Sequence, residues 1–223
     1  MTRIAALVPM RHHSQRVPGK NYRILGGKPL FHHIIETLLD VRVIDEVIVD
    51  TDSPIIKHGL TENFPQVKVI DRPNSLQADD VPMNAILLHD VSLVEADYYL
   101  QTHCTNPLLR AQTITEAIQT FLDKIDQYDS LFSVTRWQTR LWDQDGHPVN
   151  HNPDILLQTQ DLPLFYEENS CMYIFLGSTL IERRNRLGER PLMYEINSAE
   201  AWDIDEELDF AIVDFLMKER KNE

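Results

Sequence analysis

The sequence predicts an α/β domain with a mostly parallel sheet. Three observations predict this class: short apolar runs alternate with amphipathic helical patterns, the chain has 223 residues, and its composition is globular, with 43% hydrophobic and 25% charged residues. Strands that alternate with helices at this spacing are joined by right-handed crossovers and therefore lie parallel in one sheet. A chain of this length forms a sufficient core without disulfide or metal staples. We expect a single domain over residues 1–223.

Buried strands and helices alternate in the first half of the chain. Residues 4–9 form a continuous apolar run, which is typical of a strand buried on both faces. A polar loop over 11–21 follows, and Pro29 then opens a helical pattern with apolar residues four apart. Ser53 and Pro54 form a helix start, because a capping residue is followed by proline. The other elements expected in this half are strands over 46–50, 67–70 and 98–101 and a helix over 82–94.

The alternation continues in the second half and is interrupted once. The regular elements expected here are helices over 111–125 and 206–218 and strands over 130–134 and 171–175. Residues 137–166 have no long period, and this excursion holds the aromatic residues Trp137, Trp142, Phe165 and Tyr166. Exposed aromatic side chains are costly unless something covers them, so we expect a lid or an oligomer arm. A surface loop fits the composition equally well.

Composition argues against several classes of function. With 21 Lys and Arg against 35 Asp and Glu, the net charge is −14, which is a poor match for a long phosphate backbone but allows a small phosphate ligand in a local basic pocket. Cys104 and Cys171 do not form a CxxC pair, so neither a disulfide framework nor a zinc site is expected. No apolar run approaches the roughly 18 residues of a membrane span. We expect a cytoplasmic protein that binds neither nucleic acid nor membrane.

Polar residues that follow the expected strands are the candidates for a binding site, since ligands of open α/β sheets bind beyond the carboxyl ends of the strands. Arg11, Arg16 and Lys20 follow the first strand and suit a polyphosphate, whose negative charge they can neutralise. Spacing alone explains them equally well as solvated surface charges. The chain has neither a Walker A motif nor a dinucleotide-binding fingerprint.

A pair of carboxylates near the end of the chain is the candidate metal site. Asp203 and Asp205 lie two apart, so in an extended segment they point to the same side and offer oxygen ligands for Mg²⁺. Alternatively, Asp205 caps the helix that begins near residue 206. Asp209 stands one turn further on, and His103 follows the fourth strand, where a structural, hydrogen-bonded role is the simpler interpretation.

Several sequence motifs follow one another along the chain. The opening motif consists of Pro9, Met10, Arg11, Ser14, Arg16, Pro18, Lys20 and Asn21, followed by Leu25, Gly27, Lys28, Pro29 and Leu30. Four further segments follow: 49–52, Arg72 and Pro73 with Asp79, 105–108, and Asp203 and Asp205 with Asp209. Together and in this order, these motifs resemble the acylneuraminate cytidylyltransferase family, whose members activate sialic acids and related sugar acids. The resemblance covers nearly the whole chain.

This resemblance implies a Rossmann-like three-layer α/β/α nucleotidyltransferase fold, with CTP and a sugar acid as substrates and Mg²⁺ as cofactor. It also implies a homodimer in which the excursion over 137–166 packs on the partner. By position, Arg11 and Lys20 would be catalytic, and Asp203 and Asp205 would hold the metal. The nucleotide would be bound by Pro9, Met10, Arg16, Asn21, Arg72, Asp79 and His103. The sugar would be bound by Gln101, Asn169 and Tyr173. The basic loop (residues 11–21) and the acidic pair (Asp203 and Asp205) are therefore predicted to meet across a single cleft.

The sequence departs from the family pattern at three places, and these keep alternatives open. His13 stands where a glycine is common, and His103 stands where a glutamine is common. Residues 167–170 read Glu-Glu-Asn-Ser in place of Arg-Pro-Asn-Gly, and two glutamates would repel an acid. The alternatives are a nucleotidyltransferase for another sugar or another nucleoside triphosphate, and a catalytically silent relative that binds a nucleotide.

Overall fold

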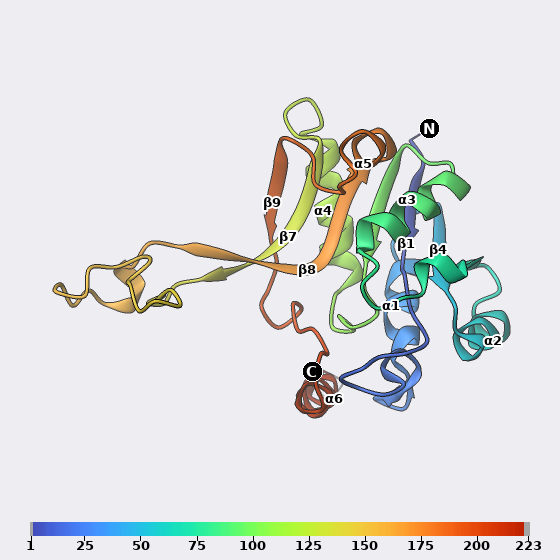
Figure 1. The fold of residues 1–223 in the computed structure, drawn as a ribbon, viewed down its shortest axis with the longest axis horizontal. Coiled ribbons are helices and arrows are strands. Elements are labelled where there is room, and N and C mark those ends of the chain that lie inside the picture. Colours follow the sequence, from blue (N-terminus) through green and yellow to red (C-terminus); the bar gives the residue numbers. More distant parts are fainter. Residues whose placement is uncertain (1, 221–223) are drawn as a thin grey trace.

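A seven-stranded sheet forms the centre of the computed structural model, which describes residues 2–220 (Figure 1). The strand order is β5-β4-β1-β6-β8-β7-β9. The strands are β1 (Ile4–Leu7), β4 (Glu46–Thr51), β5 (Lys68–Asp71), β6 (Tyr98–Thr102), β7 (Ser130–Trp137), β8 (Phe165–Leu176) and β9 (Pro191–Glu195). β5, β4, β1 and β6 are parallel, β8 is antiparallel to both its neighbours, and β9 runs parallel to β7. The predicted mostly parallel sheet is confirmed.

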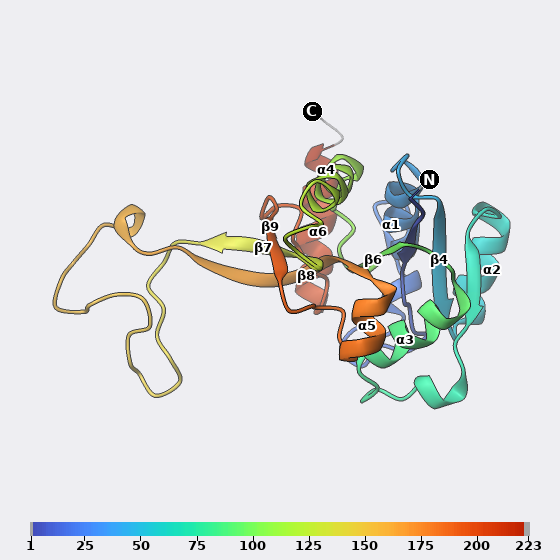
Figure 2. The same cartoon turned by 90° about the horizontal axis from the view of Figure 1, so that it is seen from above.

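Helices cover both faces of the sheet and make three layers (Figure 2). The helices are α1 (Leu30–Leu39), α2 (Pro54–Asn63), α3 (Met83–Leu93), α4 (Ala111–Leu122), α5 (Gly177–Arg183) and α6 (Glu207–Arg220). Side chains alternate along β1, as they must in a strand: Ile4 and Ala6 join the core under α1, α2 and α4, whereas Ala5 and Leu7 join the core under α3 and α5. Both faces of the central strand are therefore apolar, which explains its unbroken apolar run.

The N-terminal loop and the C-terminal helix α6 share a small core of their own. Val17 and Leu25 from the loop side pack with Ile204, Phe210 and Val213. This contact brings the end of the chain against the loop that follows β1, and so it brings the predicted basic and acidic segments together.

A local sequence signal accounts for the start of α2. The Ser53 hydroxyl accepts a hydrogen bond from the backbone N–H of Ile56 at 3.3 Å, and Pro54 occupies the first helical position, so the predicted start of α2 is confirmed. Four elements lie outside the sequence prediction. β2 (Ile24–Leu25) and β3 (Lys28–Pro29) form a short two-stranded sheet. α5 spans less than two full helical turns, and β9 is an edge strand with mostly half-exposed residues. None of these segments has enough periodicity to be recognised.

The two ends of the excursion over 137–166 form strands, whereas the sequence predicted an irregular segment there. β7 and β8 run past the sheet as a two-stranded ribbon that projects far from the body (Figures 1 and 2). Trp137 pairs with Phe165 and Arg136 with Tyr166, so Trp137, Phe165 and Tyr166 belong to strands and not to an irregular stretch. Backbone pairing that extends a strand beyond the core leaves no burial pattern in the sequence. We call residues 134–168 the arm.

No helix in the described part of the chain combines the length and the apolar character that crossing a bilayer requires.

Candidate active site

Four parallel strands end at the same edge of the sheet, and the candidate site lies there. The loops after β1, β4, β5 and β6 carry the predicted residues, because parallel neighbours present their carboxyl ends together. A cavity of about 560 Å³ opens at this edge. Ten predicted site residues line it: Pro9, Arg11, Arg16, Lys20, Asn21, Arg72, Asp79, His103, Asp203 and Asp205.

A glycine turn and two side-chain hydrogen bonds shape the basic loop. Gly19 has φ 69°, a left-handed conformation that a residue with a Cβ adopts only with strain. The Asn21 amide donates to the carbonyl oxygen of Arg11 at 2.8 Å, and the Asp52 carboxylate accepts the backbone N–H of His12 at 2.7 Å. The loop is therefore held against the end of β4, with its cations directed into the cavity.

The predicted meeting of the basic loop and the acidic pair is confirmed. The Lys20 ammonium donates to the backbone oxygen of Ile204 at 2.6 Å and to Asp205 Oδ1 at 3.2 Å. Arg16 reaches the same Asp205 oxygen at 2.6 Å. Lys20 has a side chain only 13% exposed, so its charge is held inside the site and is not a solvated surface charge.

The third cation of the loop pairs with a different carboxylate. The Arg11 guanidinium bonds Asp79 Oδ1, and the Gln15 amide bonds the other oxygen of the same side chain. Gln15 also lines the cavity, although no sequence pattern distinguishes it from an ordinary loop residue. Each predicted phosphate-binding cation thus has a carboxylate partner within the cavity wall.

The acidic pair is fixed by the backbone between its two members. Ile204 is buried, and its N–H donates to the carbonyl oxygen of Thr105 at 2.9 Å, which ties the segment to the loop after β6. Burial raises the pKa of Asp203; a hydrogen bond with Thr105 opposes this shift and the charge of Asp205 adds to it. Partial burial acts against ionisation of Asp205, but the hydrogen bond and charge of Lys20, with Arg16, lower its pKa overall.

The donor set fits a divalent cation. Asp203 Oδ1 is buried and has no hydrogen-bond partner among the described residues, which is an unfavourable state for a carboxylate oxygen. A hard cation such as Mg²⁺ would satisfy this oxygen and would remove the mutual repulsion of Asp203 and Asp205.

Asp209, and not Asp205, caps the last helix. Its Oδ2 accepts the backbone N–H groups of Asp205 at 2.8 Å and of Glu206 at 2.7 Å. A carboxylate in the first turn that reaches back to the N–H groups before it forms half of a capping box. The alternative interpretation of Asp205 as the helix cap is therefore wrong, and its carboxylate faces the cavity instead.

The part of the cavity that is predicted to bind the nucleotide holds a buried arginine and a neutral histidine. Arg72 is buried, and its guanidinium bonds the carboxylate of Asp50. Burial, with the charges of Arg186 and Lys20, lowers the pKa of His103 to about 4. Its unprotonated Nε2 accepts a hydrogen bond from the Gln101 amide at 3.0 Å.

Three predicted site residues do not line either cavity. Met10 is buried in the core, so its side chain cannot reach a ligand in the cavity. Gln101 and Tyr173 are also fully buried, and both contact Arg186, which stacks on the Tyr173 ring at 3.5 Å and donates to the Gln101 oxygen. Arg186 follows the unpredicted helix α5, and nothing in the sequence singles it out.

A second cavity, of about 530 Å³, adjoins the first. Its lining includes Asn169, the third predicted sugar-binding residue, together with Glu167, Glu168, Trp202 and the capping residue Asp209. Ser170, Asp203 and Asp205 line both cavities. The acidic pair therefore stands where two binding spaces meet.

This geometry is consistent with the comparisons with known proteins. A family model described as cytidylyltransferase matches residues 5–213. The chain belongs to the cytidylyltransferase family. The predicted resemblance and the predicted nucleotidyltransferase class are thereby confirmed.

Two curated relatives have nearly the same sequence identity to this chain. CMP-N,N'-diacetyllegionaminic acid synthase of Legionella pneumophila is 31% identical, and the match covers 97% of each chain. N-acylneuraminate cytidylyltransferase A of Danio rerio is 30% identical over 95% of this chain, which spans only 50% of that relative.

Solved structures confirm the fold of this cytidylyltransferase. CMP:2-keto-3-deoxy-manno-octonic acid synthetase, complexed with CTP, has a TM-score of 0.73 at 17% identity, with 98% of this chain and 100% of that chain covered. A 4-diphosphocytidyl-2C-methyl-D-erythritol synthase has a TM-score of 0.69 at 15% identity, with 97% and 99% covered.

Proposed function

We propose that the protein transfers CMP from CTP to a sugar acid and releases pyrophosphate, with Mg²⁺ as cofactor. The names of the relatives support this reaction: one is a CMP-N,N'-diacetyllegionaminic acid synthase, and another is an N-acylneuraminate cytidylyltransferase. The solved neighbour that binds CTP supports the choice of nucleotide.

The meeting of two cavities at the acidic pair carries the proposal. A transfer of this kind needs one space for the nucleoside triphosphate, another for the acceptor, and a shared boundary where the acceptor hydroxyl reaches the α-phosphorus. Asp203 and Asp205 lie on that boundary, and only the first cavity is lined by Arg11, Arg16 and Lys20. The triphosphate is therefore assigned to the first cavity and the acceptor to the second.

The reaction exchanges one bond for another at the α-phosphorus. A bond forms between the acceptor oxygen and the phosphorus, and the bond to the bridging oxygen of the β-phosphate breaks. Lys20 and Arg11 stabilise the negative charge that collects on the departing pyrophosphate, and Arg16 supports them. Asp203 and Asp205 would hold Mg²⁺, and the bound ion would supply positive charge near the reacting phosphate.

The nucleotide and acceptor sides have separate sets of residues. Asn21, Arg72, Asp79, His103 and the backbone at Pro9 form the wall for the nucleotide. Asn169 lies on the acceptor side. Gln101 and Tyr173 line neither cavity, but Gln101 contacts the lining residue His103, and Tyr173 contacts the lining residues Ser170 and Glu168. The site thus has a defined place for each substrate.

The acceptor cavity favours a second candidate, a sugar without an acid group. Its lining carries Glu167 and Glu168, and within the described residues no lysine or arginine lines it. Glu167 accepts the Trp137 indole N–H at 2.7 Å, and Glu168 accepts the Tyr173 hydroxyl. A carboxylate substrate would meet negative charge here unless another cation reaches it.

Pyrophosphate release from CTP and Mg²⁺ with a panel of acceptors tests both candidates. The panel should contain nonulosonic acids, octulosonic acids and neutral sugars, and the product should be identified by mass spectrometry. We expect release with a nine-carbon sugar acid and the appearance of its CMP ester. Release only with a neutral sugar would establish the second candidate, and replacement of CTP by UTP, GTP or ATP tests base choice.

We further propose that the arm binds a second copy of the chain and so forms a homodimer. The tip of the arm is apolar and exposed: the side chain of Leu156 is 90% exposed and that of Trp142 is 53% exposed. Patches of this kind mark association sites.

Sedimentation of the Leu156→Asp variant and of the wild type tests this proposal. Asp145→Asn, on the same arm, is the control. We expect the wild type and the control to sediment as dimers and Leu156→Asp to sediment as a monomer. A wild type that sediments as a monomer at micromolar concentration would contradict it.

A further inference from the structure

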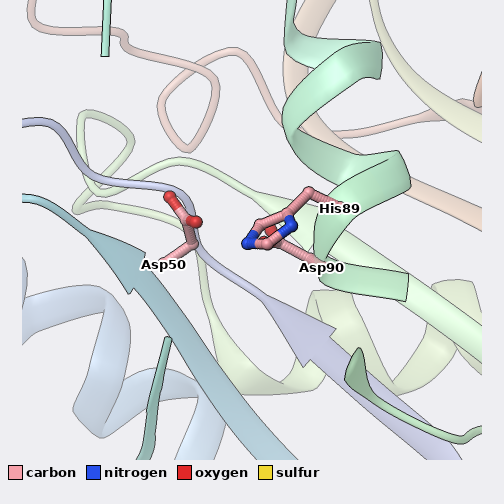
Figure 3. A group of neighbouring side chains, drawn as sticks. All are labelled: Asp50, His89 and Asp90. Atoms are coloured by element: carbon pink, nitrogen blue, oxygen red, sulfur yellow. The ribbon is translucent and has the colours of Figure 1, made fainter. Parts of the chain in front are cut away.

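A buried cluster of titratable groups lies beside the nucleotide cavity without lining it. Asp50 on β4 and Asp90 on α3 are each 1% exposed, and their carboxylate oxygens and a ring nitrogen of His89 lie within 4.8 Å of one another. Figure 3 shows His89 and Asp90 reaching from α3 toward Asp50. Nothing in the proposed reaction requires this cluster.

The cluster concentrates the unsatisfied polar atoms of the protein. Six buried side-chain atoms of the described residues have no hydrogen-bond partner, and four of them are here: Asp50 Oδ2, His89 Nε2 and both oxygens of Asp90. Native interiors seldom leave such groups unpaired, because each costs desolvation energy without a compensating bond. Something therefore occupies or neutralises this space.

Arg72 connects the cluster to the nucleotide cavity. Its Nε donates to Asp50 Oδ1, and its terminal nitrogen lies 3.4 Å from the backbone oxygen of Asp50. Arg72 itself lines the cavity. The orientation of the Asp50 carboxylate consequently sets the orientation of a cavity-lining guanidinium.

Charge balance decides what neutralises the cluster. Two carboxylates and one guanidinium carry a net charge of −1 in a region shielded from water. One proton makes the group neutral, whereas a divalent cation would leave a charge of +1 beside Arg72. Buried charges are stable only when they are compensated, so the proton is favoured.

The surroundings of Asp90 agree with this balance. Burial and the charge of the neighbouring Asp50 carboxylate raise the pKa of Asp90 to about 8, and the charge of Arg72 opposes this shift. The titratable and charged groups around Asp90 come from several elements: Asp50 from β4, Arg72 from the segment after β5, and His89 from α3, the helix of Asp90 itself. β1 and α5 contribute Leu7 and Leu180 to this side of the sheet, and these are apolar.

We propose that Asp90 is a positioning residue that carries a proton and donates it in a hydrogen bond to Asp50 Oδ2, and thereby fixes Arg72 at the wall of the nucleotide cavity. The second part of this inference rests on the proposed function, because Arg72 matters there only if the cavity binds a nucleotide. The first part, the protonated pair, stands by itself and is tested first.

Unfolding at several pH values tests the protonated pair. The pKa of Asp90 is raised in the folded state, so between its ordinary value of 3.8 and about 8 the folded protein holds a proton that the unfolded chain has lost. Its contribution to stability therefore falls as the pH rises through this range and levels off above it. Asp90→Asn keeps a donor toward Asp50 and has no proton to lose.

We expect Asp90→Asn to raise the midpoint of thermal unfolding above that of the wild type, by a small amount at pH 5 and by several degrees at pH 8. Glu62→Gln, on the exposed side of α2, is the matched control and should follow the wild type at every pH. A constant difference between Asp90→Asn and the wild type from pH 5 to pH 8 would overturn the proposal. So would a rise in midpoint on adding Zn²⁺ that Asp90→Asn abolishes, because a cation would then fill the space.

Steady-state kinetics test the effect on Arg72. Asp90→Leu removes the donor, and we expect it to raise KM for CTP several-fold with little change in kcat, while Asp90→Asn restores the wild-type KM. The wild-type KM should also rise above pH 8, and that of Asp90→Asn should not. An unchanged KM in Asp90→Leu would refute the positioning role. If the wild type shows no turnover at all, the proposed function fails, and the unfolding experiment still decides the protonated pair.

Discussion

Two pairs of carboxylates in this protein have opposite surroundings. Asp203 and Asp205 line two cavities and face Lys20 and Arg16. Asp50 and Asp90 line neither cavity and are almost fully buried, and only Asp50 bonds an arginine, Arg72. Repulsion within the first pair can be relieved by a cation that enters from the cavity.

Repulsion within the second pair has no such remedy, and a retained proton is the simplest way to neutralise it. Whether a ligand can reach a carboxylate pair from a cavity therefore matters more than which residues form the pair. A pair that a cation can reach serves as an exchangeable binding site, and a pair that it cannot reach serves as a fixed support. We call Asp203 and Asp205 the open pair and Asp50 and Asp90 the closed pair. Four experiments, in decreasing order of expected size, test this distinction at the open pair.

Loss of one carboxylate charge from the open pair should have the largest effect. Asp205→Asn removes a predicted metal ligand and the partner of Lys20 and Arg16. We expect kcat to fall about 10³-fold, equivalent to about 4 kcal/mol, with circular dichroism unchanged. Glu206→Gln, the exposed neighbour, is the matched control. Activity within threefold of the wild type would show that the open pair does not serve the reaction.

Loss of the buried cation opposite that pair should have the next largest effect. Lys20→Ala is expected to lower kcat/KM about 100-fold, because the charge on the leaving pyrophosphate loses one stabilising partner. Lys28→Ala removes a lysine whose partner, Glu36, lies outside both cavity linings, and should be neutral. Equal effects of the two substitutions would indicate a general loss of positive charge rather than a site.

Ligand binding should stabilise the wild type through the open pair. Mg²⁺ and CTP at about 100 times their dissociation constant should add about 2.7 kcal/mol to the free energy of unfolding. Asp203→Asn should lose this gain, although without ligand it should be at least as stable as the wild type, since its buried carboxylate has an unpaired oxygen and a raised pKa. Thermal unfolding with and without both ligands measures the two effects. Stabilisation of the variant to the same extent as the wild type would place the metal elsewhere.

The sequence predicts the open pair better than the closed one, and the reason is physical. Asp203 and Asp205 stand in an irregular segment with a recognisable spacing, and the basic loop has its own motif. Asp90 is part of a helix whose apolar residues repeat every three to four positions, and it occupies the buried face beside Ile86 and Leu87. A carboxylate on a buried face is a usable signal, but its partner Asp50 comes from another element, and only the fold shows that they meet.

Other residues could not be found from the sequence because their roles depend on long-range contacts. Arg186 reaches Gln101 and Tyr173 from a segment after a short helix, and Gln15 shares Asp79 with Arg11. Neither position has a periodic or motif signature. The arm shows the same limit, because its strands pair with each other beyond the core.

The smallest expected effect concerns Asp209, the carboxylate that holds the backbone of the open pair. Asp209 accepts the N–H groups of Asp205 and Glu206, so it holds the backbone of the pair at the start of α6. Asp209→Ala should cost about 1 kcal/mol of stability, as loss of a helix cap does, and should lower kcat several-fold because the backbone at Asp205 is less constrained. Asp209→Asn keeps an accepting oxygen and should retain most of the stability and most of kcat. Urea unfolding measures the stability, and initial rates measure kcat. If Asp209→Ala lost stability but kept its full rate, the position of Asp205 would be set by Ile204 and Lys20 alone.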